Sequence, residues 1–203
     1  GVHIFGAGES RFVNVTVTAN RANADGNGPG SGGRGGGIYR GSSLELSNSI
    51  VAGNYVGTGA DGDEIRGTVV AVSSYNLIGT SSTSADSGGL SAARHNLFVD
   101  DTSDLHLGPL TDNGGPTQTH ALLGGSLAID TGANSLAVAP NGIPLIRDQR
   151  GQQRIFASSV DLGAFELIDQ DGDGVDNSLE DHAPHSGDGN DDGMPDSQQS
   201  NVA

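Results

Sequence analysis

The residues with the clearest capacity for chemistry are the acids of the C-terminal region, which recur at alternate positions of two short loops. Residues 169–180 fit the pattern D-x-D/N-x-D/N-G-x5-E at every specified position. Residues 188–199 fit it everywhere except at the last position, where Gln replaces Glu. Alternate side chains of a tight loop can aim their oxygens at one point, and Ca²⁺ takes about six to eight oxygen ligands. The spacing therefore predicts two calcium sites in tandem; the alternative is an acidic, solvated and disordered tail.

The pattern also assigns the ligands of each site. In the first loop they are Asp169, Asp171, Asp173, the carbonyl oxygen of Val175, Asn177 (directly or through water) and both carboxylate oxygens of Glu180. In the second loop they are Asp188, Asn190, Asp192, the carbonyl oxygen of Met194, Asp196 and Gln199. Gln199 offers one neutral oxygen where Glu180 offers two charged ones. The second site is therefore expected to be weaker, or to be completed by water.

The residues that flank the loops do not predict paired helices. Residues 160–168 alternate as a strand does, and only short turns are expected after each loop, at 178–183 and from Ser197. With such flanks the region resembles the calcium repeats of thrombospondin type 3 and dockerin modules, and not a calmodulin-like EF-hand pair. That resemblance implies Asp176 and Asp191 as further candidate ligands.

The net charge limits the partners that the chain can take. Residues 169–203 hold nine Asp, one Glu and no Arg, and so contribute −10 of the formal net charge of −16. This excess argues against nucleic acid and anionic membrane surfaces as partners. No apolar run approaches the roughly 20 residues of a membrane-spanning helix. Cysteine is absent, which suits an exported bacterial protein as well as a cytosolic one.

The elements that position the loops are predicted to be strands arranged in repeats. Gly accounts for 34 of 203 residues and no long amphipathic helical stretch occurs. Residues 15–20 match residues 49–54 at an offset of 34, which becomes 22 when the Gly-rich insertion at 26–37 is removed. An offset of 22 then separates Asn54 from Asn76, and residues 75–79 match residues 95–99 at an offset of 20. Such a period predicts an all-β solenoid of parallel coils.

Repeated Asn residues and apolar residues are expected to hold the coils together. The Asn residues would stack as a ladder at one corner of the solenoid, formed by Asn20, Asn54, Asn76 and Asn96. The apolar residues would fill a narrow core, formed by Val15, Val17, Leu44, Leu46, Ile50, Val69, Leu77, Ile78, Leu97 and Phe98.

Long motifs between residues 107 and 166 carry a second resemblance. The chain reads LGPLTDNGGPTQTHALL at 107–123, GSLAIDTG at 125–132, DQRG at 148–151 and VDLGAFE at 160–166. These motifs resemble the C-terminal part of bacterial extracellular right-handed parallel β-helix proteins of the choice-of-anchor Q group. The chain departs from the usual family residues at Gly124 and Leu127, where Pro is common, and at Leu162, where Ile is. The resemblance implies secretion or surface display and no established activity.

Two groups of polar residues allow a different chemistry. A polysaccharide lyase or glycoside hydrolase on this fold would need acids and a base, which could come from Arg94, His95, Asp100, Asp101 and Asp104. The motif residues His120, Asp130, Asp148, Arg150 and Asp161 could form a carbohydrate or metal site. The favoured alternative for them is a hydrogen-bonded network that locks the last coils, with Arg150 bridging carboxylates. Three Tyr and no Trp leave little aromatic surface for a carbohydrate-binding module.

These observations together predict the organisation and the function. Residues 1–107 are expected to form parallel β-helix coils, residues 108–168 the C-terminal part of the β-helix, and residues 169–203 tandem calcium-binding loops. The expected function is that of a calcium-stabilised structural or adhesive domain, secreted or at the bacterial cell surface, in contact with a surface polysaccharide. The chain opens on strand-like residues, so we expect a processed or excised piece with an open coil end. Another copy could cover that end head to tail and build a filament.

Overall fold

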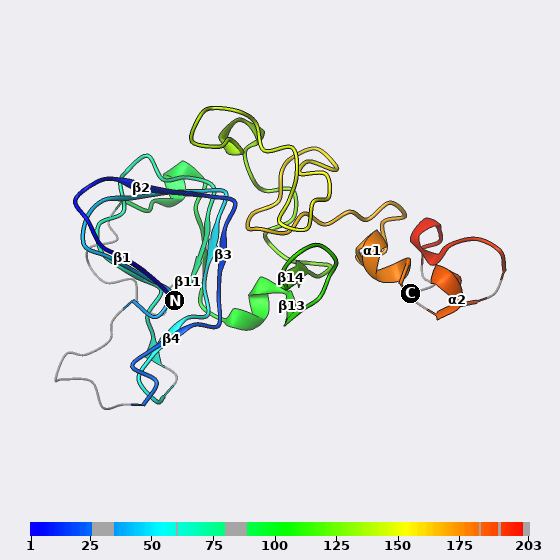
Figure 1. Ribbon diagram of the computed structural model, residues 1–203, viewed down its shortest axis with the longest axis horizontal. Helices are drawn as coiled ribbons and strands as arrows, with labels where there is room; N and C mark the ends of the chain where they lie inside the picture. Colours follow the sequence, from blue (N-terminus) through cyan, green and yellow to red (C-terminus); the bar gives the residue numbers. More distant parts are fainter. Residues whose placement is uncertain (26–34, 60, 80–88, 183, 191, 201–203) are drawn as a thin grey trace.

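The computed structural model describes residues 1–25, 35–59, 61–79, 89–182, 184–190 and 192–200, which are mostly strands and turns with little helix (Figure 1). Most of the predicted Gly-rich insertion at 26–37 lies outside the described residues. The strands are β1 Val2–Ile4, β2 Ser10–Val13, β3 Thr16–Val17, β4 Arg21–Ala22, β5 Ile38–Arg40, β6 Leu44–Ser47, β7 Ile50–Val51, β8 Tyr55–Val56, β9 Asp61–Gly62, β10 Ile65–Arg66, β11 Leu77–Gly79, β12 Leu97–Val99, β13 Leu107–Thr111 and β14 Thr119–Leu122. The helices are η2 Ala92–Arg94, η3 Thr102–Leu105, η4 Asn134–Leu136, α1 Asn177–Glu180, α2 Pro184–Gly187 and η5 Asp196–Gln198.

Most strands of the first hundred residues pair in parallel with strands of the preceding and following passes of the chain, whereas β9 pairs antiparallel with β8. The sheets have the orders β1-β5-β10, β12-β11-β7-β3 and β2-β6, while β4 pairs in parallel with β8. Thr16 faces Ile50 and Leu77 faces Leu97, which confirms the offsets of 34 and 20 residues. The intermediate offset of 22 is wrong, because Ile50 faces Leu77, an offset of 27. The offset of 22 rested on matching Asn54 with Asn76, but Asn54 follows β7 whereas Asn76 precedes β11.

Apolar residues of these strands are buried on both faces of the sheets. Val51 and Ile78 belong to one core cluster, together with Ile38, Leu44, Leu46, Ile65 and Val69. Their neighbours Ile50 and Leu77 belong to a second cluster, together with residues between Val99 and Leu167. Adjacent residues of a strand point to opposite faces, so the two clusters lie on either side of the β7–β11 pair. The expected single narrow core is therefore two cores, and Phe98, which was expected inside, is 41% exposed on the edge strand β12.

The segment after β12 leaves the parallel arrangement. β13 and β14 pair antiparallel, and no further strand is assigned between residues 123 and 168, all of which are described. This differs from the expectation that residues 108–168 continue the coils. The motif glycines explain how this segment packs instead. A Cβ on Gly163 would lie 2.5 Å from Thr16 Oγ1, so only glycine permits the close approach of this turn to β3.

Figure 1 shows the chain progressing from the stacked strands through this loop-rich segment to α1 and α2 at the far end of the molecule. The junction between the strands and the loop-rich segment is formed by hydrogen bonds across more than a hundred residues of sequence. Gly163 N donates to Asn48 O over 2.8 Å and Ala164 N donates to Thr16 Oγ1 over 3.0 Å. Among the described residues, no helix combines the length and the apolar character that crossing a bilayer requires.

Candidate metal centre

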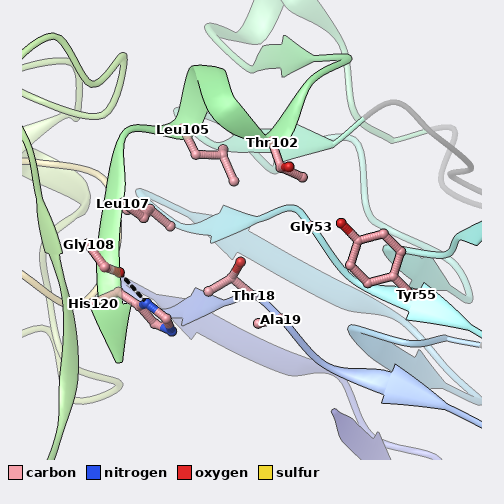
Figure 2. Close-up of a pocket in the computed structure, with 9 residues that line it drawn as sticks. All are labelled: Thr18, Ala19, Gly53, Tyr55, Thr102, Leu105, Leu107, Gly108 and His120. Carbon is pink, nitrogen blue, oxygen red and sulfur yellow. Dashed lines mark hydrogen bonds between the residues drawn. The ribbon is translucent and has the colours of Figure 1, made fainter. Parts of the chain in front are cut away.

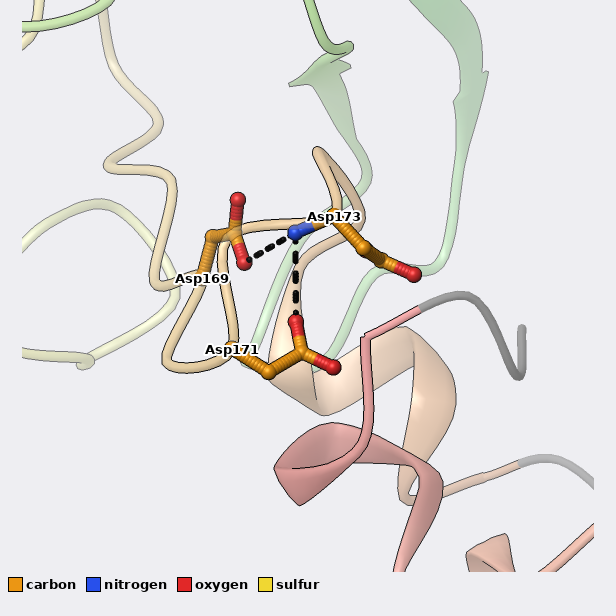
Figure 3. A group of neighbouring side chains, drawn as sticks. All are labelled: Asp169, Asp171 and Asp173. Carbon is orange, nitrogen blue, oxygen red and sulfur yellow. Dashed lines mark hydrogen bonds between the residues drawn. The ribbon is translucent and has the colours of Figure 1, made fainter.

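The first acidic loop is a tight turn organised by its own carboxylates (Figure 3). Asp169 accepts the N–H groups of Gly172 and Gly174 over 2.7 and 2.9 Å, and Asp173 accepts that of Val175 over 2.9 Å. Gly172 and Gly174 have φ values of 82° and 93°, a backbone region that favours glycine. These bonds orient Asp169, Asp171 and Asp173 so that one oxygen of each lies within 4.8 Å of the others.

Glu180, at the end of α1, interacts electrostatically with these three aspartates, although it lies outside the group whose oxygens are within 4.8 Å of one another. Its side chain is buried, with the residue only 3% exposed, yet neither carboxylate oxygen has a hydrogen-bond partner in the described part of the chain. Asp171 Oδ2 is also buried without a partner. A buried, unpaired carboxylate is costly unless a cation or a proton neutralises it. The donor set is made only of oxygens, which suits a hard cation such as Ca²⁺.

The electrostatics of the cluster agree with this geometry. Burial, and after it repulsion from Asp173, Asp171 and Asp169, together raise the pKa of Glu180 to about 7. The pKa of Asp171 is also raised, first by loss of solvent and then by its acidic neighbours. Both shifts mean that negative charge on these carboxylates is disfavoured unless a proton or a cation neutralises it.

The second loop repeats the hydrogen bonds of the first position by position. Asp188 accepts Gly193 N over 2.8 Å and Asp192 accepts Met194 N over 2.9 Å, as Asp169 and Asp173 do in the first loop. The last position differs. The amide nitrogen of Gln199 donates to Asp192 Oδ1 over 2.9 Å and to the carbonyl oxygen of Met194 over 3.0 Å. Two predicted ligands of the second site are therefore bonded to an N–H donor in place of an ion.

The two loops pack against each other. Ser197 Oγ donates to Asp181 Oδ1 over 2.8 Å, and Ser200 Oγ donates to the carbonyl oxygen of Asp171 over 2.8 Å. Asp196, predicted as a ligand of the second loop, is 1% exposed and accepts Gly189 N over 3.1 and 3.0 Å. Asn177, its counterpart in the first loop, accepts Gln170 N over 2.9 Å.

The further ligands implied by the resemblance have other positions. Asp176 caps α1 by accepting Ser178 N over 3.0 Å, and it forms an ion pair with Arg150 over 2.9 Å. Asp176 therefore supports α1 and is not aimed at the three aspartates. Asp191 lies outside the described residues.

The four predicted ladder residues form two pairs at different corners. Asn20 Nδ2 donates to Asn54 Oδ1 over 3.0 Å at the ends of β3 and β7. Asn76 Nδ2 donates to Asn96 Oδ1 over 2.8 Å at the starts of β11 and β12. The expectation of one ladder of four is corrected by this arrangement. Sequence reasoning missed Glu64, fully buried, which accepts Asn54 N and Asn54 Nδ2 and extends the first pair.

The motif residues between 148 and 166 form a buried polar network, as the favoured alternative predicted for Asp148, Arg150 and Asp161. Asp130 joins it through its N–H, which donates to Asp161 Oδ1, whereas His120 bonds Gly108 O instead. Arg150 bridges Asp148 and Asp176, while Arg154 lies 3.3 Å from Glu166. Arg154 and Glu166 were not singled out from the sequence, although Glu166 closes a quoted motif. Burial is the first cause that raises the pKa of Glu166 to about 8 and that of Asp161 to about 6.

The candidates for sugar chemistry are dispersed. Asp101 caps η3 by accepting Ser103 N over 2.8 Å, and His95 stacks on Tyr75. A pocket between the β3–β7 ends and β13–β14 is lined by Thr18, Tyr55, Thr102 and His120 among others, with no carboxylate in its lining (Figure 2). His120 is already bonded there to Gly108 O over 2.7 Å. The pocket therefore lacks the carboxylate pair that glycoside hydrolysis uses.

Comparison with known proteins adds no identity to these observations. No family model matches the chain, and neither a curated protein nor a solved structure matches it.

Proposed function

We propose that the chain is a calcium-dependent structural domain, with one principal Ca²⁺ ion in the first loop. The observation that carries this proposal is the buried Glu180 carboxylate, which has no hydrogen-bond partner for either oxygen in the described part of the chain and is repelled by a cluster of three aspartates. Asp169, Asp171, Asp173 and Glu180 would be the side-chain ligands, with the carbonyl oxygen of Val175. When bound, Ca²⁺ supplies the positive charge that this cluster otherwise lacks.

The second loop is a weaker site in this proposal. The Gln199 amide already satisfies Asp192 and Met194, so an ion must displace two hydrogen bonds before it can bind. The role of the second loop here is to pack against the first loop, to which it is joined through Ser197 at Asp181 and through Ser200 at the carbonyl oxygen of Asp171.

The parallel pairing of the strands between β1 and β12, β9 excepted, supports a right-handed parallel β-helix as the framework, and the motifs between residues 107 and 166 support its kinship with the choice-of-anchor Q group. Under this proposal the domain is secreted or displayed at a bacterial surface, where millimolar calcium is available. Extracellular calcium modules bind with a Kd of about 10⁻⁴–10⁻³ M. A structural or adhesive role is favoured over an enzymatic one, because Asp101 caps η3 and because Asp148 and Asp176 are buried in ion pairs with Arg150.

Titration calorimetry of the whole chain with CaCl₂ tests the proposal. The wild type should bind calcium, and Glu180→Gln should weaken binding by 100-fold or more, on the order of 3 kcal/mol, because it removes a charged bidentate ligand. Glu9→Gln is the matched control, since it makes the same substitution on an exposed side chain far from the loops in sequence and should leave affinity within about twofold. Absence of calcium binding by the wild type, or equal binding by Glu180→Gln, would contradict the proposal.

A further inference from the structure

The first calcium loop is attached to the rest of the molecule through a fully buried arginine. Arg150 Nε donates to Asp148 over 2.9 Å, and Nη2 donates to the carbonyl oxygen of Glu166 over 2.6 Å. Nη1 and Nη2 then reach Asp176 over 2.9 and 3.3 Å. The guanidinium also lies 3.5 Å from the centroid of the Phe165 ring. These contacts, with one to Ser178, use all the N–H donors of the side chain and fix its position.

Asp176 connects Arg150 to the segments on either side of the first loop, which carry the proposed metal ligands. Its carboxylate accepts Ser178 N and so begins α1, the helix that carries Glu180 at its other end. The same carboxylate accepts Ile168 N over 3.0 Å, directly before the loop. Arg150 therefore holds both ends of the first loop through one carboxylate, without touching the metal cluster.

Two further contacts join the loop to the apolar part of the molecule. Gly124 N donates to Gly174 O over 3.2 Å, and a Cβ on Gly124 would lie 3.3 Å from Gly174 Cα. Leu179 of α1 packs against the core cluster that contains Ile50 and Leu77. The loop is thus continuous with the core beneath β7 and β11.

We propose that Arg150 and Asp176 are positioning residues that preset the first loop for calcium, so that calcium binding stabilises the strands as well as the loop. The proposal rests on the proposed calcium function and extends it. It moves the boundary of the stable unit beyond residue 168, where the sequence placed it. A ligand that binds only the folded form stabilises whatever unfolds together with its site.

The chain carries a natural reporter for this coupling. Its only tyrosines are Tyr39, Tyr55 and Tyr75, and it has no Trp. Tyrosine fluorescence therefore follows the strands and not the loops. With calcium about 100-fold above Kd, the midpoint of the thermal tyrosine transition should rise by roughly 5 to 10 °C relative to the chelated chain.

Variants test the route of the coupling. Asp176→Asn keeps a side chain that can cap α1 but removes the ion pair, and Arg150→Lys keeps the charge but removes the planar fork. Each should lower calcium affinity by about 10- to 100-fold and reduce the calcium-dependent shift of the tyrosine transition. Gly124→Val, whose side chain would push Gly174 away, should also lower calcium affinity and reduce the shift, although it leaves the ion pair itself unchanged. Glu9→Gln, on an exposed side chain far from the loops in sequence, should change neither quantity.

The outcomes separate this inference from the proposed function. Calcium binding by calorimetry with an unchanged tyrosine midpoint would overturn the coupling and leave the calcium site intact. Wild-type affinity in Asp176→Asn, Arg150→Lys and Gly124→Val would overturn the positioning role. A wild type that binds no calcium would instead contradict the proposed function itself.

Discussion

At the scale of single residues, the last position of each acidic loop decides how that loop balances its charge. Glu180 brings a fourth negative charge to the three aspartates of the first loop, and its oxygens have no donor. Gln199 brings an N–H group to the same position of the second loop and bonds two predicted ligands. The first loop therefore needs a cation or a proton to balance its charge. In the second loop, the neutral Gln199 amide donates hydrogen bonds to two of the predicted ligands instead.

Gln199→Glu should convert the second loop into a full calcium site. The change removes the N–H donor and adds a bidentate carboxylate, so we expect the number of strongly bound ions to rise from one to two in calorimetry. Gln198→Glu makes the same charge change on the exposed neighbouring side chain and should leave the number at one. Two equally strong sites in the wild type would show that the Gln199 amide does not limit the second loop.

The buried network around Arg150 and Arg154 predicts a dependence of stability on pH. Asp148, Asp161, Glu166 and Asp176 contribute four carboxylates against two guanidiniums, and burial raises the pKa of Glu166 from 4.5 to about 8. The folded chain then holds a proton that the unfolded chain releases. Its contribution is complete below about pH 4.5 and is lost as the pH rises through 8. The slope should approach about 1.4 kcal/mol per pH unit for each proton held.

Urea unfolding at several pH values in saturating calcium measures this dependence. Glu166→Gln cannot take up the proton, so its stability should change less between pH 5 and 8 than that of the wild type. Wild-type stability that increases over this interval would refute the expected sign.

At the scale of the elements, paired Asn side chains connect successive strands where the backbone turns. Asn76 donates to Asn96 Oδ1 and Leu46 O and accepts Ser49 N, while it is itself fully buried. Its amide thus replaces backbone pairing at the corner before β11. Each buried polar group left without a partner costs about 1–3 kcal/mol.

Asn76→Ala should therefore destabilise the chain by roughly 2–4 kcal/mol, because it leaves several buried groups unpaired. Urea unfolding followed by tyrosine fluorescence checks this value. Asn141→Ala, at an exposed turn, is the control and should cost less than about 1 kcal/mol. A loss at Asn76 no greater than that at Asn141 would mean that water replaces the missing amide.

Strand type and parallel pairing could be predicted from the sequence because identical short patterns recur at offsets of 34 and 20 residues. The offset of 27 between Ile50 and Leu77 could not, since Asn54 and Asn76 look alike in sequence but lie on opposite sides of their strands. The presence of two cores could not be predicted either. Adjacent apolar residues such as Ile50 and Val51 do not show by themselves that other segments cover both faces of the sheet. The clustering of Asp169, Asp171 and Asp173 could be predicted from loop spacing, whereas the roles of Asp176 and Gln199 depend on partners far away in the sequence or on side-chain direction.

At the scale of the whole molecule, the acidic region has two parts that are held differently. The first loop is bound to the core through Asp176 and Leu179, whereas the second reaches it mainly through the first. Ten acids within residues 169–203 repel one another when calcium is absent.

Limited digestion with endoproteinase Glu-C in EDTA should therefore begin beyond α1. Mass spectrometry should detect cleavage after Asp181 or Asp188 first, with the fragment ending there resistant for longer. Calcium should slow this cleavage by covering Glu180 and ordering the loops. First cleavage between residues 166 and 173 would instead support the boundary at residue 168 that the sequence predicts.

The hydrogen bonds that join the loop-rich segment to β3 and β7 have a mechanical consequence. A force that pulls the strands of a parallel sheet apart sideways acts on one strand pair at a time. The sheet β12-β11-β7-β3 would therefore separate strand by strand. The loop-rich segment forms hydrogen bonds with Asn14, Thr16 and Asn48. Their partners are Asp161, Ala164 and Ala133, respectively. These hydrogen bonds hold β3 and β7 together from outside the sheet, so a force that separates β3 from β7 must break them as well. A domain tethered at a surface would thereby resist peeling from its first strand.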